Sequence, residues 1–109
     1  LVIANWPEKR GEVWRTLLRA RAYEGQCYVL GVNRVGIAQG HRHRGDSALI
    51  DPYGVAISSA AVSPGIVLGE IDTDEVERCR SKNRFLADRR RDVYATLAAQ
   101  EEEGQEPCR

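Results

Sequence analysis

Residues 26–35 read QCYVLGVNRV, and this stretch decides the fold class. Apolar side chains occupy nearly every position instead of alternating with polar ones. A strand with one face in water alternates, whereas a strand with both faces covered need not. We therefore predict a buried strand here, covered on both faces as in a layered α/β domain.

The residues before this strand predict a helix from Glu12 to Glu24. Gly25 follows where a left-handed residue would end the helix, because glycine adopts positive φ without a Cβ clash. The carboxylate of Glu24 opposes the dipole at this helix end, so we expect an arginine to hold it. The apolar side chains recur every three or four residues, as on one side of a helix: Val13, Trp14, Leu17, Leu18, Ala20 and Ala22.

The chain opens with a second apolar segment. Leu1, Val2 and Ile3 read as a short buried strand, and the residues from Asn5 to Pro7 as the irregular segment that leaves its end. A strand this apolar normally has neighbouring strands, and no methionine precedes it. We therefore expect that Leu1 is not the natural beginning of the protein.

After the central strand, the sequence predicts a loop and then a hairpin. Residues 36–46 are polar and punctuated by glycine, which is typical of a loop. Residues 47–60 read as two strands joined by a tight turn. Proline favours φ near −65° in such a turn, so we expect the turn to begin at Asp51 and Pro52 and to close at Gly54.

The last third predicts one strand, one helix and a tail. Residues 65–72 read as a strand, and residues 73–82 as a helix. Asp72, followed three residues later by Glu75, is a typical helix start. Residues 95–109 are acidic, and we expect them to be a disordered tail.

Composition excludes several classes of partner. Sixteen basic and sixteen acidic side chains cancel, so net charge selects neither nucleic acid nor an anionic membrane. No apolar run approaches the roughly 20 residues that cross a bilayer, and the first residues do not read as a secretory signal. Cys27, Cys79 and Cys108 are widely spaced without a CxxC pair, which is typical of reduced thiols. We therefore predict a cytoplasmic protein.

Five blocks of sequence stand out, in this order: ANWPEKR (4–10), WRTLLRARAYEGQCYVLGVNRVG (14–36), HRGDSALIDPYG (43–54), EIDTDEV (70–76) and FLADRRRDVY (85–94). Together they resemble the C-terminal half of the carbon-nitrogen hydrolases of the nitrilase superfamily, closest to the omega-amidase-like branch. Val13 stands where this branch often has His, and Gly25 where it often has Asn.

The resemblance implies an α/β fold, namely the C-terminal portion of an αββα sandwich, with residues 1–94 as part of the hydrolase domain. Members hydrolyse amides or nitriles through a cysteine nucleophile, a glutamate base and a lysine, without a cofactor. In the family all three precede the segment that matches ANWP, so none is carried over to this chain. The implied substrate is a small amide, cleaved to acid and ammonia. The implied partners are the N-terminal half of the domain and further copies in a homo-oligomer.

Within this chain, we predict that Asn5 and Trp6 contact the substrate. Ligands of open α/β folds lie at the carboxyl ends of strands, and these residues leave such an end. Trp6 would form a pocket wall and Asn5 would donate to a carbonyl. The alternative is that both side chains only pack the loop, since tryptophan is commonly buried.

Other reactive residues read as structural. Cys27 starts a buried apolar strand without a nearby His, which favours a packing role over a nucleophilic one. Lys9 and Lys82 are the only lysines, and neither is placed to work with a cysteine. His41 and His43 lie beside arginines that repel a cation, so we predict no metal site.

The alternatives to an amidase are a carbamoyl-type amidohydrolase and a non-catalytic interaction or nucleic-acid-binding fragment. Nucleic-acid binding is suggested by the one dense basic stretch of the sequence. Against it, no set of aromatic side chains for base stacking alternates with the basic residues, and acidic residues lower the net charge of the stretch. In the family this segment runs along the surface near a dimer partner. Its basic members are Arg78, Arg80, Lys82, Arg84, Arg89, Arg90 and Arg91.

Overall fold

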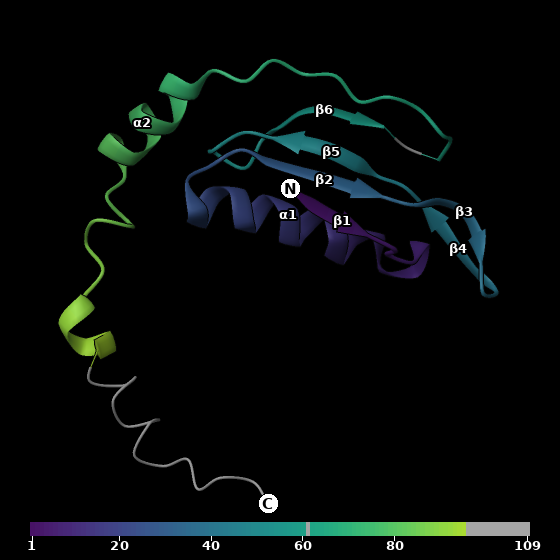
Figure 1. The fold of residues 1–109 in the computed structure, drawn as a ribbon, viewed down its shortest axis with the longest axis horizontal. Helices are drawn as coiled ribbons and strands as arrows, with labels where there is room; N and C mark the ends of the chain where they lie inside the picture. The colour runs from purple at the N-terminus through teal and green to yellow at the C-terminus, as the bar shows by residue number, and fades with distance from the viewer. Residues whose placement is uncertain (61, 96–109) are drawn as a thin grey trace, which may run out of the picture.

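The computed structural model of the chain describes residues 1–60 and 62–95, and its centre is a four-stranded sheet with the order β1-β2-β5-β6 (Figure 1). Strand β2 pairs in parallel with β1 and antiparallel with β5, which pairs antiparallel with β6. The strands are β1 (Val2–Ala4), β2 (Val29–Asn33), β5 (Ser47–Ile50) and β6 (Ala56–Ala60).

Helix α1 (Gly11–Gly25) connects the parallel strands β1 and β2 and covers one face of the sheet. A short 3-10 helix, η1 (Glu8–Arg10), precedes it. The buried side of α1 presents Trp14, Leu18 and Ala22, whose spacing of four residues follows the helical period. They pack against strand residues, and together these form the hydrophobic core: Trp14, Leu18, Ala22, Val29, Ala48 and Ile50. The predicted helix is confirmed, although Val13 and Leu17 of its predicted stripe are exposed.

The end of α1 differs from the expectation in one residue. Gly25 is still helical, and Gln26 adopts the left-handed conformation with φ of 47°. The Gln26 side chain is buried and donates to the carbonyl oxygens of Cys79 and Asn83, at 3.3 and 2.5 Å. These tertiary contacts offset the cost of positive φ at a residue with a Cβ. The arginine expected for Glu24 is Arg21, one turn before it.

Two expectations of burial are wrong. Leu1 and Ile3 are 80% and 76% exposed, because β1 is the edge strand of the sheet and α1 packs over β2 and β5. Strand β2 alternates instead of being covered on both faces: Gly31 is buried against α1, whereas Val32, on the other face, is 40% exposed. In place of a second layer, the segment 62–72 crosses this other face.

The predicted loop 36–46 is wrong, because most of it forms a β-hairpin. Strands β3 (Val35–Ala38) and β4 (His41–Arg44) pair antiparallel in a separate two-stranded sheet. Their connection is Gln39–Gly40, with φ of 51° and 74°. Two successive positive φ values match the twist of a tight hairpin. Because this hairpin lies outside the core, it carries many polar side chains, and its sequence lacks the apolar pattern by which strands are predicted.

The predicted strand 65–72 is also wrong, since this segment pairs with no strand in the part of the chain that the structure describes. It runs close over the sheet, where a Cβ on Gly69 would lie 2.6 Å from a methyl carbon of Leu49. The apolar composition of this segment is typical of a strand. A strand also needs a neighbouring strand for its backbone hydrogen bonds, and this segment lies beside none in the described structure.

The remaining elements confirm the predictions. The β5–β6 turn closes with Gly54 N donating to Asp51 O at 3.0 Å. Helix α2 (Thr73–Lys82) begins at Asp72, whose side chain accepts from Asp74 N at 2.9 Å. The predicted disordered tail, residues 95–109, lies outside the described residues apart from Ala95.

Candidate functional site

The carboxyl ends of β1 and β2 lie together at one end of the sheet. The two strands are parallel, with Ala4 opposite Asn33. Asn5 and Trp6 therefore leave β1 next to the point where Asn33 and Arg34 leave β2. Arg34 N donates to Ala4 O at 3.1 Å, which ties the two exits together. Such an end is where open α/β folds place ligands.

Asn33 fixes the segment that follows β1. Trp6 N donates to Asn33 Oδ1 at 2.7 Å, and Asn33 Nδ2 donates to Trp6 O at 3.1 Å and to Gly45 O at 2.8 Å. Asn33 N in turn donates to Ser47 Oγ at 2.9 Å. Asn33 is only 8% exposed, so it is a buried polar group whose bonds hold the backbone of Trp6 in place. The reasoning that singled out Asn5, a polar residue at a strand end, would also have found Asn33.

Trp6 is half-buried and packs beside the core. Its ring centroid lies 5.8 Å from that of Trp14, and the Arg10 guanidinium lies 5.3 Å from the Trp6 ring centroid. Its indole Nε1 donates to Arg10 O at 2.6 Å. The ring is thus held by contacts within the chain, and its uncovered part is available for further contact.

Asn5 is exposed and lines a hollow of about 220 Å³ between the exit of β1 and the β3–β4 hairpin. We call it the hairpin hollow. Trp6, the other predicted site residue, does not line this hollow. The lining residues are Asn5, Pro7, Arg34, Ala38, Gln39, His41 and His43.

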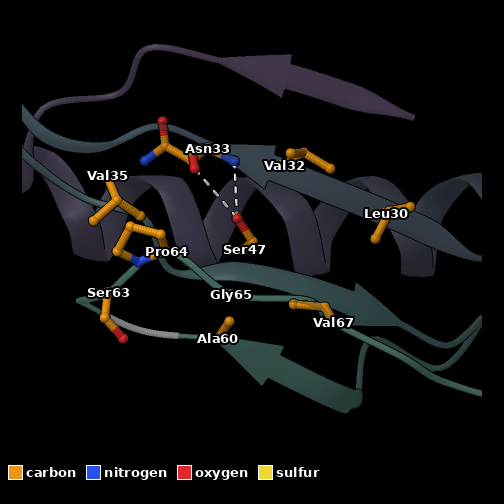
Figure 2. A pocket seen from close by; sticks show the side chains of 10 residues that line it. All are labelled: Leu30, Val32, Asn33, Val35, Ser47, Ala60, Ser63, Pro64, Gly65 and Val67. Atoms are coloured by element: carbon orange, nitrogen blue, oxygen red, sulfur yellow. Dashed lines mark hydrogen bonds between the residues drawn. The ribbon is translucent and has the colours of Figure 1, made fainter.

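A larger hollow of about 400 Å³ lies on the open face of the sheet. Figure 2 shows Leu30 and Val32 of β2 on one side and Pro64 and Val67 of the crossing segment on the other. Its polar end is Ser47, which donates to Asn33 O at 3.4 Å. The lining contains no titratable side chain, so this hollow supplies apolar contact and no acid-base chemistry.

The reactive residues considered as catalysts lie away from this end. Cys27 precedes β2, so six residues of chain, at about 3.3 Å each, place it roughly 20 Å from Asn33. It is half-buried and packs against the core. Cys79 is buried in α2, and its thiol donates to Pro52 O at 3.6 Å. Both cysteines occupy packing positions.

His41 and His43 share β4 but differ in burial. His41 is exposed, whereas His43 is 7% exposed. Within residues 1–60 and 62–95, no group of three or more His, Cys, Asp or Glu side chains is arranged to hold a metal ion. The Nδ1 atom of His43 is buried and has no hydrogen-bond partner in the described structure.

Three of the seven basic residues in the basic stretch, Arg78, Arg84 and Arg90, pair with acidic neighbours. Arg78 pairs with Asp72 and Glu75, and its hydrogen bonds hold the pKa of each carboxyl below its usual value. Further along, Arg84 pairs with Asp88 at 3.3 Å. These pairs reduce the free charge that the stretch offers to a phosphate backbone.

Comparison with known proteins gives the family of the chain. A family model described as carbon-nitrogen hydrolase matches residues 2–81. The 2-oxoglutaramate amidase of Bacillus subtilis is 37% identical over 93 residues, which cover 85% of this chain and 36% of that protein. The omega-amidase YafV of Escherichia coli K12 is 51% identical over 61 residues, covering 55% of this chain and 24% of YafV.

Solved structures agree with this result. The CN-hydrolase superfamily protein XC1258 of Xanthomonas campestris superposes with a TM-score of 0.74 at 34% identity, covering 82% of this chain and 36% of that one. The NitFhit protein of C. elegans superposes with a TM-score of 0.75 at 32% identity, and the match covers 84% of this chain and 22% of that one. The chain spans about a third or less of the length of these relatives.

In the described residues, no helix is long and apolar enough to cross a membrane. The fold is the mixed α/β fold that the sequence predicts, and its neighbours belong to the nitrilase superfamily. With a family model matched over most of its length, this chain belongs to the carbon-nitrogen hydrolase family.

Proposed function

We propose that this chain is the C-terminal part of an omega-amidase-like enzyme that hydrolyses a small terminal amide to an acid and ammonia. The match to residues 2–81 carries the proposal. The choice of a terminal amide, among carbon-nitrogen bonds, is supported by the relatives named 2-oxoglutaramate amidase and omega-amidase. The carbamoyl-type alternative has no such support in these names.

The proposed reaction needs a thiolate nucleophile. A base takes the proton of the thiol, and the thiolate attacks the amide carbonyl. The protonated base returns that proton to the nitrogen, which leaves as ammonia, and water then hydrolyses the thioester to the acid and the free thiol. We propose that the cysteine, the glutamate and the lysine for these steps belong to a segment outside residues 1–109. This is supported by the distance of Cys27 from the carboxyl end of β2 and by the presence of only two lysines.

In this proposal, the described residues contribute the substrate side of the pocket. Asn5 is exposed at the carboxyl end of β1, and Trp6 is held there by Asn33. Asn5 would hydrogen-bond the substrate, and the uncovered part of the Trp6 ring would form a wall. The open sheet face, with its apolar hollow, would pack against the remainder of the domain. Assembly as a homo-oligomer and a cytoplasmic location remain predictions.

The test compares two proteins. One is the chain alone, and the other is the extended protein, which joins residues 1–109 to the preceding catalytic segment. Ammonia release from glutaramate is expected only from the extended protein. Replacing Cys27 by Ala in the extended protein should leave turnover unchanged. Turnover by the chain alone that the Cys27→Ala change abolishes would contradict the proposal.

A further inference from the structure

The connection between β4 and β5 is left-handed at both of its residues. Gly45 and Asp46 have φ angles of 81° and 53°. We call these two residues the β4–β5 joint. Left-handed backbone is unfavourable for a residue with a Cβ, although aspartate tolerates it better than most residues do. The conformation of the joint therefore depends on contacts that other elements supply.

The side chain of Asp46 is held between α1 and β4. Its Oδ2 accepts from Arg15 Nη1 at 2.5 Å, and its Oδ1 lies 3.8 Å from Arg44 Nε. Oδ2 also lies at the start of α1, where a Cβ on Gly11 would be 3.5 Å away and where the helix dipole favours a negative charge. The Asp46 side chain is only 12% exposed, so these contacts fix its position.

The carbonyl groups of the joint reach Trp6 by two routes. Gly45 O accepts from Asn33 Nδ2 at 2.8 Å, and Asn33 Oδ1 accepts from Trp6 N at 2.7 Å. Asp46 O accepts from Trp14 Nε1 at 2.9 Å, and the Trp14 ring packs against the Trp6 ring. The first route holds the backbone of Trp6 and the second holds its ring. A change in the joint would therefore displace both.

We propose that Asp46 is a positioning residue, which acts on the substrate through Trp6. Its ion pair with Arg15 keeps the joint left-handed, and the joint keeps the Trp6 ring in place at the carboxyl end of β1. The inference rests on the proposed function, in which Trp6 forms a wall of the pocket. It adds to that function a residue on the far side of Trp14, which contacts no substrate itself.

The kinetic test uses the extended protein with glutaramate. Asp46→Ala removes the carboxylate and disfavours the left-handed backbone, and it should lower kcat/KM about five- to thirtyfold, mainly through KM. Asparagine tolerates this backbone and keeps an oxygen that can accept from Arg15. Asp46→Asn should therefore restore most of the loss.

A second change, in Trp6, separates positioning from a purely structural role. If Asp46 acts through Trp6, the two changes share one effect. Asp46→Ala should then lower kcat/KM, measured per folded protein, less than about twofold in a protein that already carries Trp6→Ala. An equal loss with and without Trp6→Ala would overturn the inference.

Glu12→Ala is the matched control, because Glu12 pairs with the same arginine but is 86% exposed on α1. It should change kcat/KM less than about twofold, whereas Arg15→Gln should lower it about three- to tenfold. Arg15→Gln leaves Asp46 in the chain, so it also serves if Asp46→Ala does not fold. An effect of Arg15→Gln no larger than that of Glu12→Ala would overturn the inference.

An NMR measurement separates this inference from the proposed function. The indole N–H signal of Trp6, identified as the one that Trp6→Ala removes, should shift in Asp46→Ala or Arg15→Gln and stay in place in Glu12→Ala. If the extended protein hydrolyses no glutaramate, the proposed function fails, and a shifted signal still supports the placement of Trp6 by Asp46. An unshifted Trp6 signal in the folded variants would overturn that placement.

Discussion

At the scale of single residues, two tryptophans in ring contact have different surroundings. Trp14 is 3% exposed, and its Nε1 donates to Asp46 O at 2.9 Å. Trp6 is half-buried, at the exit of β1, and is fixed through its backbone by Asn33. The Trp6 side chain adds a hydrogen bond from Nε1 to Arg10 O, and the uncovered part of its ring is the surface that the proposed substrate would contact.

The first prediction compares Trp6→Ala with Trp14→Ala in the extended protein. Losing part of an indole contact, worth about 1 to 3 kcal/mol, should lower kcat/KM of Trp6→Ala roughly ten- to a hundredfold. Trp14→Ala should instead lower the free energy of unfolding by about 3 to 5 kcal/mol, with little kinetic change in the folded fraction. Urea unfolding and steady-state kinetics measure both quantities. If Trp6→Ala unfolds the protein while the folded fraction keeps full kcat/KM, Trp6 is a core residue.

At the scale of elements, the contact between α1 and β2 depends on a residue without a side chain. Gly31 lies in the middle of β2, where a Cβ would overlap a methyl group of Leu18 and lie 3.0 Å from Cζ2 of Trp14. The glycine lets α1 approach the sheet closely. The close approach of α1 therefore requires a residue without a Cβ at this position, whatever its strand propensity.

The second prediction is that Gly31→Ala destabilises the extended protein by about 1 to 3 kcal/mol, because the added methyl overpacks the interface. Gly65→Ala is the control, since a Cβ there would meet only Ser63 O at 3.9 Å. Its effect should stay within about 0.5 kcal/mol. The measurement is the urea concentration at the unfolding midpoint of each variant. Equal midpoints for Gly31→Ala and Gly65→Ala would contradict the close approach of α1 to β2.

Helix α2 is attached to the rest of the chain by few contacts. Gln26 donates to carbonyl oxygens of Cys79 and Asn83, and the Tyr23 and Phe85 rings lie 5.7 Å apart between centroids. Its first turn is held by Asp72 and by the Arg78 ion pairs. Because these carboxylates are exposed, their ion pairs contribute little in salt.

The third prediction concerns pH. Hydrogen bonds from Arg78 lower the pKa of Asp72 and Glu75 from ordinary values of 3.8 and 4.5. A lowered folded-state pKa stabilises the helix start above the ordinary value, and this stabilisation is lost as pH falls through the folded-state pKa. The amide signal of Asp74, which donates to Asp72, should therefore titrate below pH 3.8. In Arg78→Gln the midpoint should rise toward 3.8, and an unchanged midpoint would contradict the ion pair.

At the scale of the whole molecule, the described structure is extended. Its Cα radius of gyration is 18.3 Å, whereas a compact domain of this length has a radius of about 13 Å. Figure 1 shows α2 and residues 83–95 reaching away from the sheet. Large apolar side chains are exposed on β1 and on the crossing segment, with Ile66 and Leu68 86% and 81% exposed. Such surface normally lies against another part of a protein.

The fourth prediction is that the chain alone binds ANS strongly or aggregates, through this surface and the unpaired edge of β1. The extended protein, under the same conditions, should do neither. Fluorescence titration and light scattering measure the difference. A monodisperse monomer with a sharp cooperative melt would show that residues 1–109 form a complete domain.

Much of the candidate site could be predicted from local sequence. Asn5 and Trp6 were placed correctly at the carboxyl end of a strand, because a polar residue after an apolar run is a local signal. Asn33 ends the next strand in the same way. The hairpin hollow could not be predicted, since Arg34 and His43 come together only once β3 pairs with β4 and the hairpin lies over the exit of β1.

By itself, the sequence determined the elements whose stabilising contacts are local: the periodic helix α1, the Asp51–Gly54 turn and the Asp72 start of α2. Only the tertiary structure decided features that depend on distant partners. Gln26, and not Gly25, is left-handed because Cys79 and Asn83 accept its side chain. Residues 65–72 form no strand because a ladder needs a neighbouring edge, which an apolar pattern cannot supply.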